Sequence, residues 1–277
     1  MASDAHAHPH DLLRLYPNAE AERRSPGIAC AASSCTKEEF LFHEQLAFSA
    51  KQDEAPTLYQ CFAVHPQLPA STAEGCTKNL PSAAAFQDKL DLLAALAAEG
   101  RITAVGETGF DLYSEGFRAT EKIQDELFAE HLETAHRHDL PLILHVRRAM
   151  YKIFPYEKIL KTLPAVVFHS WPGAPGEGFS LLRKGIRAFF SFGTTLLLNH
   201  KNAIRSCAEF PAEHLLLETD APYQPLHGKE YSCWADLPAI LKAAAAIRKE
   251  AAAKQGTDAA ELEEIIDRNF FGIFYLK

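Results

Sequence analysis

Residues that bind metal ions or transfer protons end most of the short apolar segments in this sequence of 277 residues. The first such segment, SDAHAH at residues 3–8, carries two of them, His6 and His8. Five later segments end in the same kinds of side chain, namely His65, Glu107, His145, His169 and Asp220. Unrelated structural roles would scatter these residues along the chain, so their repeated place at segment ends predicts one shared site.

The donor atoms at these positions favour divalent metal ions. Residues two apart in a β-strand point to the same side, so His6 and His8 can bind one cation together. Imidazole nitrogens mixed with carboxylate oxygens suit Zn, Mn, Ni, Co or Fe, whereas Mg and Ca prefer all-oxygen ligands. Even four of these five histidines with the two carboxylates exceed the needs of one tetrahedral ion, and a carboxylate such as Glu107 can bridge two ions about 3.5–4 Å apart. Such a pair stabilises the attacking and the leaving oxygens in phosphodiester or amide hydrolysis.

Eight apolar segments that alternate with helical ones must position these residues. The predicted strands span residues 3–8, 27–33, 59–65, 102–107, 140–146, 165–170, 187–193 and 214–220. The clearest predicted helices span residues 82–100, 120–139, 237–256 and 258–274, with Thr120 as an N-cap and Gly100 as a C-terminal stop. Largely unbroken apolar strands between helices indicate parallel βαβ units. Eight such units in a chain of this length predict a single α/β domain over residues 1–277, a (β/α)8 TIM barrel.

The carboxyl ends of all strands in a TIM barrel open on one face, where active sites lie. The seven residues named above are therefore expected to meet there. We expect the histidines outside strand ends to be surface or capping residues, namely His43, His131, His136, His138, His200 and His214. The segment 66–82, rich in Pro, Ser and Thr, predicts a surface loop.

The composition restricts the cellular setting and the partners. The formal net charge of −8 argues against broad, sequence-independent nucleic-acid binding but not against a nucleotide held by a few contacts or by metal. Six cysteines without C-x-x-C spacing predict reduced thiols. The first 30 residues have no apolar signal region, and no apolar run approaches 18 residues, so we expect a cytoplasmic protein without membrane association or an obligate protein partner.

The ordered set of motifs resembles the TatD family of metal-dependent hydrolases, within the wider amidohydrolase-like barrels. DAHAH is similar to the family's D-x-H-x-H, FAVHP to its G-[IV]-H-P, and AVGETGFDLY to its A-[IV]-G-E-[IT]-G-L-D-[FY]. LPLILHVRRA resembles L-P-[VL]-x-[IL]-H-x-R-x-A, VFHSWPG resembles H-[CS]-F-[ST]-G, and LLLETDAPYQP resembles L-L-x-E-T-D-[AS]-P-[YF]-x-x-P. The closing NFFGIF is similar to N-x-x-x-[LI]-F. The resemblance covers nearly the whole chain.

The resemblance implies two divalent ions, Zn, Mg or Mn. One ion would be held by His6, His8, Glu107 and Asp220, and the second by Glu107, His145 and His169, with Glu107 as the bridge. His65 and Arg147 would bind the substrate's phosphate, and Glu218 would face the substrate or support the ligands. Asp220 would be the general base for the water that the ions activate. The implied activity is that of a deoxyribonuclease or phosphodiesterase, 3′–5′ on single strands, with DNA ends or another phosphodiester as substrate.

Departures from the family pattern bear on the substrate and leave every ligand in place. Ala63 replaces a Gly, Arg148 stands at a usually acidic position, and LHGKEYSCWADLP after Pro225 lacks the family's Asn-[EA]-Pro signature. Because loops after barrel strands set specificity, two alternatives stay open. One is a metal-dependent amide, ester or lactone hydrolase of the amidohydrolase superfamily. The other is a catalytically idle binding barrel.

Overall fold

Eight parallel strands form the centre of the molecule. The computed structural model describes residues 3–71, 80–252 and 259–275. The strands follow chain order within one sheet, and every neighbouring pair is parallel. They are β1 Ser3–Ala7, β2 Ala29–Ser34, β3 Leu58–Phe62, β4 Ala104–Asp111, β5 Leu142–Arg147, β6 Val166–Phe168, β7 Ala188–Phe192 and β8 Leu215–Leu217. All eight predicted strands are therefore present, and the predicted TIM-barrel fold is confirmed.

The ring of strands is joined between its first and last members just beyond β8. The Asp220 N–H donates to the His6 carbonyl at 2.9 Å, and the His8 N–H donates to the Ala221 carbonyl at 2.7 Å. Asp4 adds a side-chain link, since its Oδ1 accepts from the Thr219 N–H at 3.0 Å and its Oδ2 from the Thr219 hydroxyl at 2.6 Å. The chain segments that carry His6, His8 and Asp220 are thereby fixed to one another.

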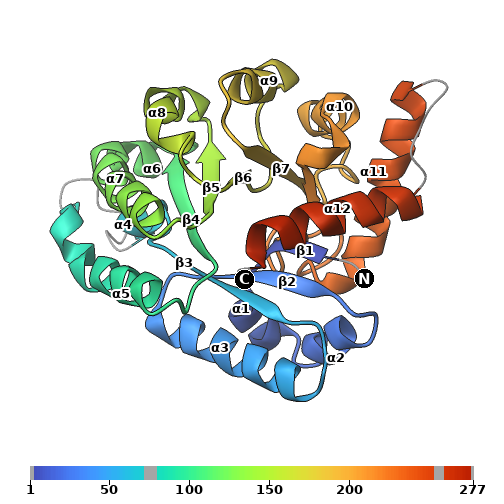
Figure 1. Ribbon diagram of the computed structural model, residues 1–277, viewed down its shortest axis with the longest axis horizontal. Helices are drawn as coiled ribbons and strands as arrows, with labels where there is room; N and C mark the ends of the chain where they lie inside the picture. The colour runs from blue at the N-terminus through green and yellow to red at the C-terminus, as the bar shows by residue number, and fades with distance from the viewer. Residues whose placement is uncertain (1–2, 72–79, 253–258, 276–277) are drawn as a thin grey trace.

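Helices surround the ring of strands (Figure 1). The longer ones are α3 Lys37–Gln52, α5 Gln87–Ala98, α7 Glu121–Arg137, α9 Pro175–Arg183, α10 Lys201–Glu209, α11 Leu237–Ala252 and α12 Ala259–Phe274. Shorter helices are α1 Pro9–Leu15, α2 Ala19–Arg24, α4 Leu68–Ser71, α6 Glu115–Ala119 and α8 Glu157–Leu160. None of the helices in the described ranges is long and apolar enough to cross a membrane.

Inward-facing side chains of the strands form a core of their own, and α12 lies across one end of it (Figure 1). Phe270 and Phe274 of α12 pack there against small inward-facing residues such as Ala29 and Ala31. Side chains alternate between faces with a period of two, so the inward series continues along each strand toward its carboxyl end. It runs from Ile143 to His145, from Val167 to His169, from Leu216 to Glu218 and from Ala31 to Ser33. The end of the barrel opposite α12 is therefore polar.

Some local predictions need correction, whereas the predicted helix stop at Gly100 is confirmed. The segment 82–100 begins with a 3-10 turn, Ala83–Phe86, before α5, and the segment 66–82 contains α4 within its described part. Thr120 occupies the N-cap position of α7 but does not cap its backbone N–H groups, and its hydroxyl accepts from the Gln124 side-chain amide and donates to the Phe117 carbonyl. Gly100 follows α5 at φ +65°, in the left-handed region that a C-terminal stop requires. The predicted helix end at Gly256 lies outside the described residues.

Two histidines expected at the surface are buried, so that prediction is wrong for His43 and His131. Each finds hydrogen-bond partners in the interior, which makes its burial tolerable. His43 Nε2 accepts from the His10 N–H, and its Nδ1 lies 3.0 Å from Ser34 Oγ. His131 Nε2 accepts from the Val64 N–H at 2.8 Å, and its Nδ1 faces the Leu127 carbonyl.

Candidate metal centre

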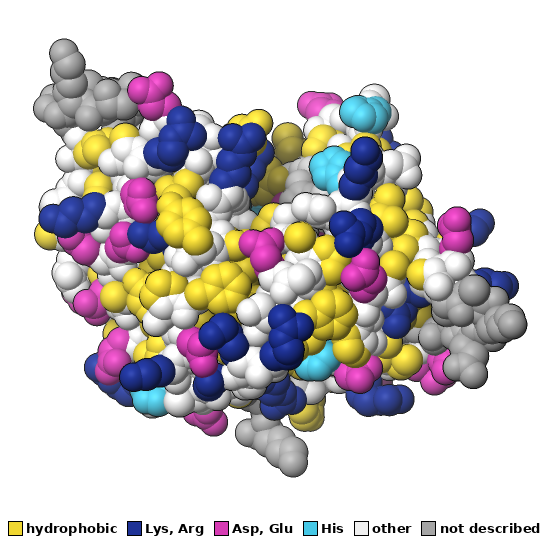
Figure 2. All heavy atoms as spheres, turned by 90° about the horizontal axis from the view of Figure 1, so that it is seen from above, with side chains coloured by type: hydrophobic (Ala, Val, Ile, Leu, Met, Phe, Trp, Pro, Cys, Tyr) yellow, Lys and Arg dark blue, Asp and Glu magenta, His cyan; other side chains and the backbone are white. Residues whose placement is uncertain are grey.

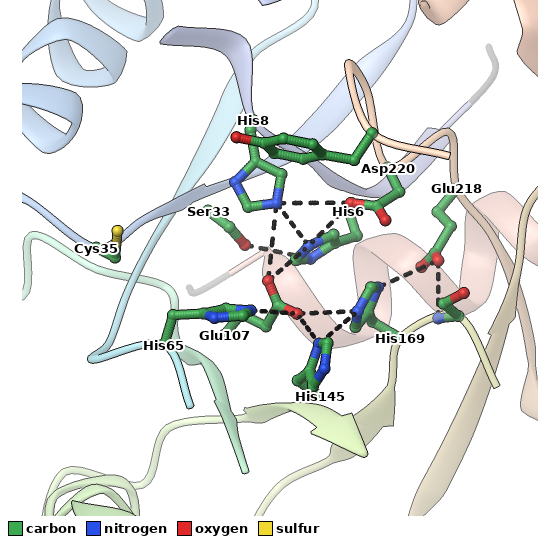
Figure 3. Close-up of polar contacts among 12 residues, drawn as sticks. His6, His8, Ser33, Cys35, His65, Glu107, His145, His169, Glu218 and Asp220 are labelled. Carbon is green, nitrogen blue, oxygen red and sulfur yellow. Dashed lines mark hydrogen bonds and ion pairs between the residues drawn. The ribbon is translucent and has the colours of Figure 1, made fainter. Parts of the chain in front are cut away.

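Glu107 lies at the centre of a ring of histidines, and its two carboxylate oxygens face different members of the ring (Figure 3). Oε2 lies 3.2 Å from His6 Nε2 and 3.7 Å from His8 Nε2. Oε1 lies 2.7 Å from His145 Nδ1, 2.9 Å from His169 Nε2 and 3.2 Å from His65 Nε2. One carboxylate thus joins two groups of nitrogen donors, which is the arrangement of a bridging ligand.

Three of these imidazoles use their second nitrogen to contact a fixed partner. His6 Nδ1 lies 3.2 Å from Ser33 Oγ, His145 Nε2 lies 3.1 Å from Asp111 Oδ2, and His169 Nδ1 lies 3.3 Å from Glu218 Oε1. An acceptor at the second nitrogen keeps the proton there, so the first nitrogen presents its lone pair to the cluster. This is the hydrogen-bond pattern of metal-binding histidines.

Asp220 completes the group on the side of His8. Its Oδ1 lies 3.5 Å from His8 Nε2 and 3.7 Å from His6 Nε2, and its Oδ2 accepts from the Gln224 amide at 2.7 Å. The same amide donates to Ser170 Oγ at 2.8 Å. Asp220, Gln224 and Ser170 all have positive φ, at 50°, 58° and 44°. Non-glycine residues with positive φ are uncommon, and clusters of them are typical of functional sites.

Glycines allow β4 to bring Glu107 into the ring. Gly109 has φ +129°, and a Cβ there would lie 2.3 Å from the His145 carbonyl oxygen on β5. A Cβ at Gly106 would lie 2.5 Å from Ile143 Cβ. Any larger residue would push β4 away from β5, so the glycines of GETGFD set the distance between Glu107 and His145.

The two carboxylates of the cluster stay anionic. Burial alone would raise the pKa of Glu107, but the charges of His65 and His169 outweigh burial and hold that pKa well below its usual value. For Asp220, burial also acts to raise the pKa, and the hydrogen bond to His8 with the charge of His169 lowers it. Two buried negative charges need cationic partners, which are protonated histidines without metal and would be metal ions once neutral histidines bind them.

The donor set fits divalent metal ions by its geometry as well. Three groups of side chains each place their ligand atoms within 4.8 Å of one another. They are His6 with Glu107 and His169, His6 with His8 and Asp220, and His65 with Glu107 and His145. Two of the groups share Glu107 and two share His6, so the donors form one continuous cluster rather than separate sites.

The structure brings eight of the nine predicted site residues to one cavity or its wall, and buries the ninth behind it. The cavity measures about 810 Å3 and is lined by His8, His65, Glu107, His145, Arg147, His169 and Asp220, with His6 against its floor. Glu218 is fully buried behind His169, where its Oε1 accepts from the Ser170 N–H at 2.7 Å. As the inward-facing residue one layer below Asp220, it contacts a histidine instead of the cavity.

Sequence reasoning missed the residues that hold the predicted ligands and the predicted base in place. Ser33, Asp111 and Gln224 each hold a predicted ligand or base in place. Asp111 stands in the GFD motif, but no role was predicted for it. Its spacing of four residues from Glu107 is the feature of the sequence that could have indicated one. No feature of the sequence indicated a role for Ser33 or Gln224, because a lone hydroxyl or amide near a strand end is common.

The mouth of the cavity differs in charge from side to side. Asp11 and Glu39, from α1 and α3, line it beside β1 and β2, whereas Arg147 lines it at the end of β5. In Figure 2 the molecule is hollowed near the upper edge of the view, with Lys and Arg side chains beside the hollow. A ligand that enters the cavity therefore meets acidic groups on one side and a cationic group on the other.

Comparisons with known proteins give one family. The model of the family described as TatD related DNase matches residues 3–275. The chain is 32% identical over 194 residues to the 3′-5′ ssDNA/RNA exonuclease TatD of Cronobacter sakazakii, covering 66% of this chain and 68% of that protein. It is 33% identical over 200 residues to the protein of the same name from Dickeya dadantii, covering 68% and 70%.

Solved structures share the fold. A TatD homologue from Escherichia coli K12, YjjV, matches with a TM-score of 0.78 at 23% identity, covering 100% of this chain and 98% of that one. An organophosphorus hydrolase from Deinococcus radiodurans matches with a TM-score of 0.57 at 12% identity, covering 99% and 92%. At these identities the structures support the barrel fold alone.

Proposed function

The chain belongs to the family of TatD-related DNases and is a metal-dependent hydrolase, and on that premise we propose that it removes nucleotides from the 3′ ends of single-stranded DNA or RNA. The observation that carries the proposal is Glu107, whose two oxygens face two separate groups of imidazoles. Phosphodiester hydrolysis needs charge stabilisation on both sides of the phosphorus, and a pair of ions joined by one carboxylate supplies it.

We propose two ions of Zn, Mg or Mn in this cluster. His6, His8, Glu107 and Asp220 would hold one, and Glu107, His145 and His169 would hold the other. When bound, such ions would lower the pKa of water toward neutrality and would neutralise charge on the phosphate. The nitrogen-rich donor set favours Zn or Mn over Mg.

The chain's own residues orient the substrate and move the proton. Asp220 takes the proton from the attacking water, and the Gln224 amide, which donates to Oδ2, holds the carboxylate in place. Arg147 binds the phosphate with its guanidinium. His65 Nδ1 accepts from the Gln67 N–H at 3.2 Å, so in neutral His65 the proton is on Nε2. That proton faces Glu107 Oε1, which lies 3.2 Å from Nε2 in this structure, and in our proposal it is donated to the substrate's phosphate when ions occupy Glu107.

One experiment tests the ions and the reaction together. Protein purified without chelator is analysed for its metal content and incubated with 3′-labelled single-stranded DNA. We expect two ions per chain and release of nucleotides. Glu107→Ala and Asp220→Ala should lose ions and lower the rate by at least about 10²-fold. Glu133→Ala, the same change at an exposed position of α7, is the control. If metal occupancy is intact under Mg, Mn and Zn and no nucleotide is released, the nuclease proposal is wrong.

No observation of its own favours the amide, ester or lactone alternative, since the amidohydrolase-like neighbours share the fold alone. A panel of chromogenic esters, lactones and bis-nitrophenyl phosphate separates the two reactions. Hydrolysis of the phosphodiester alone supports the nuclease. Family membership also favours an enzyme over the idle barrel.

We further propose that residues 1–277 act as one domain, since the inward-facing residues of all eight strands share one core. A cytoplasmic location belongs to the same proposal. Its support is that the five described cysteines are free thiols.

A further inference from the structure

An aromatic ring and two guanidinium groups stack together beside the cavity, and one of them, Arg147, lines it. Tyr113 lies in the loop after β4, and Arg147 and Arg148 end and follow β5. The Cζ atoms of Arg147 and Arg148 lie 3.8 and 4.6 Å from the centroid of the Tyr113 ring. All three side chains are exposed, Tyr113 by 45%. Nothing in the proposed reaction at the metal cluster requires Tyr113 or Arg148.

The two guanidinium groups carry charge that no acid of the described chain neutralises. Among the described residues, neither Arg147 nor Arg148 has a carboxylate within ion-pair distance, unlike Arg23 with Glu20 or Arg101 with Glu44. Two adjacent arginines without an ion pair, beside a cavity that one of them lines, suit an anionic ligand.

Hydrogen bonds fix the position of this stack relative to the cluster of predicted metal ligands. Asp111 Oδ1 accepts from the Tyr113 N–H at 2.9 Å, while its Oδ2 faces His145 Nε2. Arg118 Nη1 donates to the Tyr113 carbonyl at 3.0 Å, which holds the loop from its other side. Arg147 also lines the cavity itself. The stack and the cluster are therefore connected through one buried carboxylate.

The size and charge of the cavity determine where a longer ligand must leave it. A volume of about 810 Å3 lies within the range of small-ligand sites, about 300–1,000 Å3, so a strand cannot be contained in it. Asp11 and Glu39 repel phosphates on the side of β1 and β2. Because β5 lies four strands from β1, the arginines occupy the opposite side of the mouth. A polyanionic strand is therefore expected to leave past β5.

We propose that Tyr113, Arg147 and Arg148 form a site for the second nucleotide of a single strand whose terminal nucleotide occupies the cavity. The guanidinium groups bind the phosphodiester backbone, and the base stacks against the aromatic and guanidinium layer. The proposal rests on the proposed function and adds the residues that bind the strand beyond the scissile phosphate. Both contacts accept any base, since every base has a face that can stack.

The test measures how affinity grows with strand length. Fluorescence anisotropy of metal-loaded protein with 5′-labelled oligothymidylates of one to four nucleotides gives a Kd for each length. Phosphorothioate linkages slow hydrolysis during the measurement. For the wild type we expect a gain of about tenfold on addition of the second nucleotide, which is typical for one stacked base. In Tyr113→Ala and Arg148→Ala this gain should largely disappear.

Salt dependence separates the two kinds of contact. Removal of one phosphate contact should lower the slope of log Kd against log salt by about 0.7 in Arg148→Ala, while Tyr113→Ala should leave it unchanged. Arg187→Ala is the matched control, because Arg187 is also exposed and stacks on Phe189 at 5.9 Å but precedes β7 at the other end of the barrel. In Arg187→Ala, the affinity should increase with strand length as it does in the wild type.

The outcomes distinguish this inference from the proposed function. If the wild type gains affinity with the second nucleotide and both variants gain as much, the second-nucleotide site is wrong and the nuclease proposal stands. If the wild type binds no oligothymidylate at all, both proposals are wrong.

Discussion

Single residues outside the cavity determine whether the cluster can form, and Asp4 is an example. The sequence placed Asp4 beside two predicted ligands, but its side chain points to Thr219 rather than to the cluster. Its Oδ1 accepts from the N–H groups of Thr219 and His6, and its Oδ2 from the Thr219 hydroxyl. Since Thr219 immediately precedes Asp220, Asp4 joins the first and last segments of the barrel at the point where both deliver ligands.

We expect Asp4→Ala to lower the free energy of unfolding by about 1–3 kcal/mol, because it leaves buried N–H groups unpaired. Urea denaturation measures the change. Asp4→Asn is the matched variant, since its carbonyl oxygen can accept from both N–H groups and its amide can donate to the Thr219 hydroxyl. It should retain most of the stability. Equal losses in the two variants would contradict this account of Asp4.

Helix α7 illustrates how an element outside the barrel positions the site. Its stripe of Ile123, Leu127, Phe128, Leu132 and Ala135 is buried, as its periodicity predicts. His131, on the same buried side, accepts from the Val64 N–H next to His65, and Gln124 accepts from the Asp111 N–H at 2.8 Å. The helix therefore holds the ends of both β3 and β4 by hydrogen bonds as well as by packing.

Burial lowers the pKa of His131 to about 4, against the opposing hydrogen bond to Leu127. Because this folded-state pKa lies below the unfolded value, the unfolded chain binds the proton first. The free energy of unfolding that neutral His131 contributes is fully present above about pH 6.5 and is lost as the pH falls toward 4. We expect about 2 kcal/mol of the wild-type stability to be lost between pH 7 and pH 5 through this group.

The variant His131→Gln should show a correspondingly smaller difference in urea stability between the two pH values. His136→Gln, at an exposed position of the same helix, should behave as the wild type does. If His131→Gln and the wild type lose the same stability on acidification, the proton is not taken up by His131.

At the scale of the whole molecule, the cluster of predicted metal ligands joins segments from nearly the whole length of the chain. Its donors come from β1, β4, β5 and the segments after β1, β3, β6 and β8. An unfolded chain has no such cluster, so ions that bind only the folded chain stabilise it by mass action. Metal binding and barrel closure are therefore expected to be coupled.

We expect removal of metal by a chelator to lower the Tm by several degrees, since about 2.7 kcal/mol is lost when an ion at 100-fold its Kd is removed. Restoring Zn or Mn should restore the Tm. Calorimetry of wild type and Glu107→Ala, each with and without chelator, makes the measurement. A chelator that lowers both Tm values equally would show that its effect does not arise from this cluster.

The sequence by itself determined the architecture and the membership of the cluster. Apolar segments that alternate with helical ones predict parallel βαβ units, and eight such units in 277 residues predict a barrel. In such a barrel the carboxyl ends of the strands share one face. His145 and His169 follow directly from that rule, because they continue the inward series of Ile143 and Val167. The periodicity of each segment and the order of the segments along the chain can both be recognised in a single sequence.

Only the tertiary structure decided how the donors are aimed and what lies behind them. With Ala5 and Ala104 inward, strict alternation would turn His6 and Glu107 outward, but the strand register shifts between Asp4 and Ala7 and between Val105 and Thr108. Shifts of this kind, which re-aim side chains, depend on neighbouring strands and leave no periodic trace in the sequence. Contacts between distant segments likewise bring Asp111 to His145, bury Glu218, and stack Tyr113 on two arginines. A linear pattern specifies the face on which a side chain emerges, whereas its partners are chosen by three-dimensional packing.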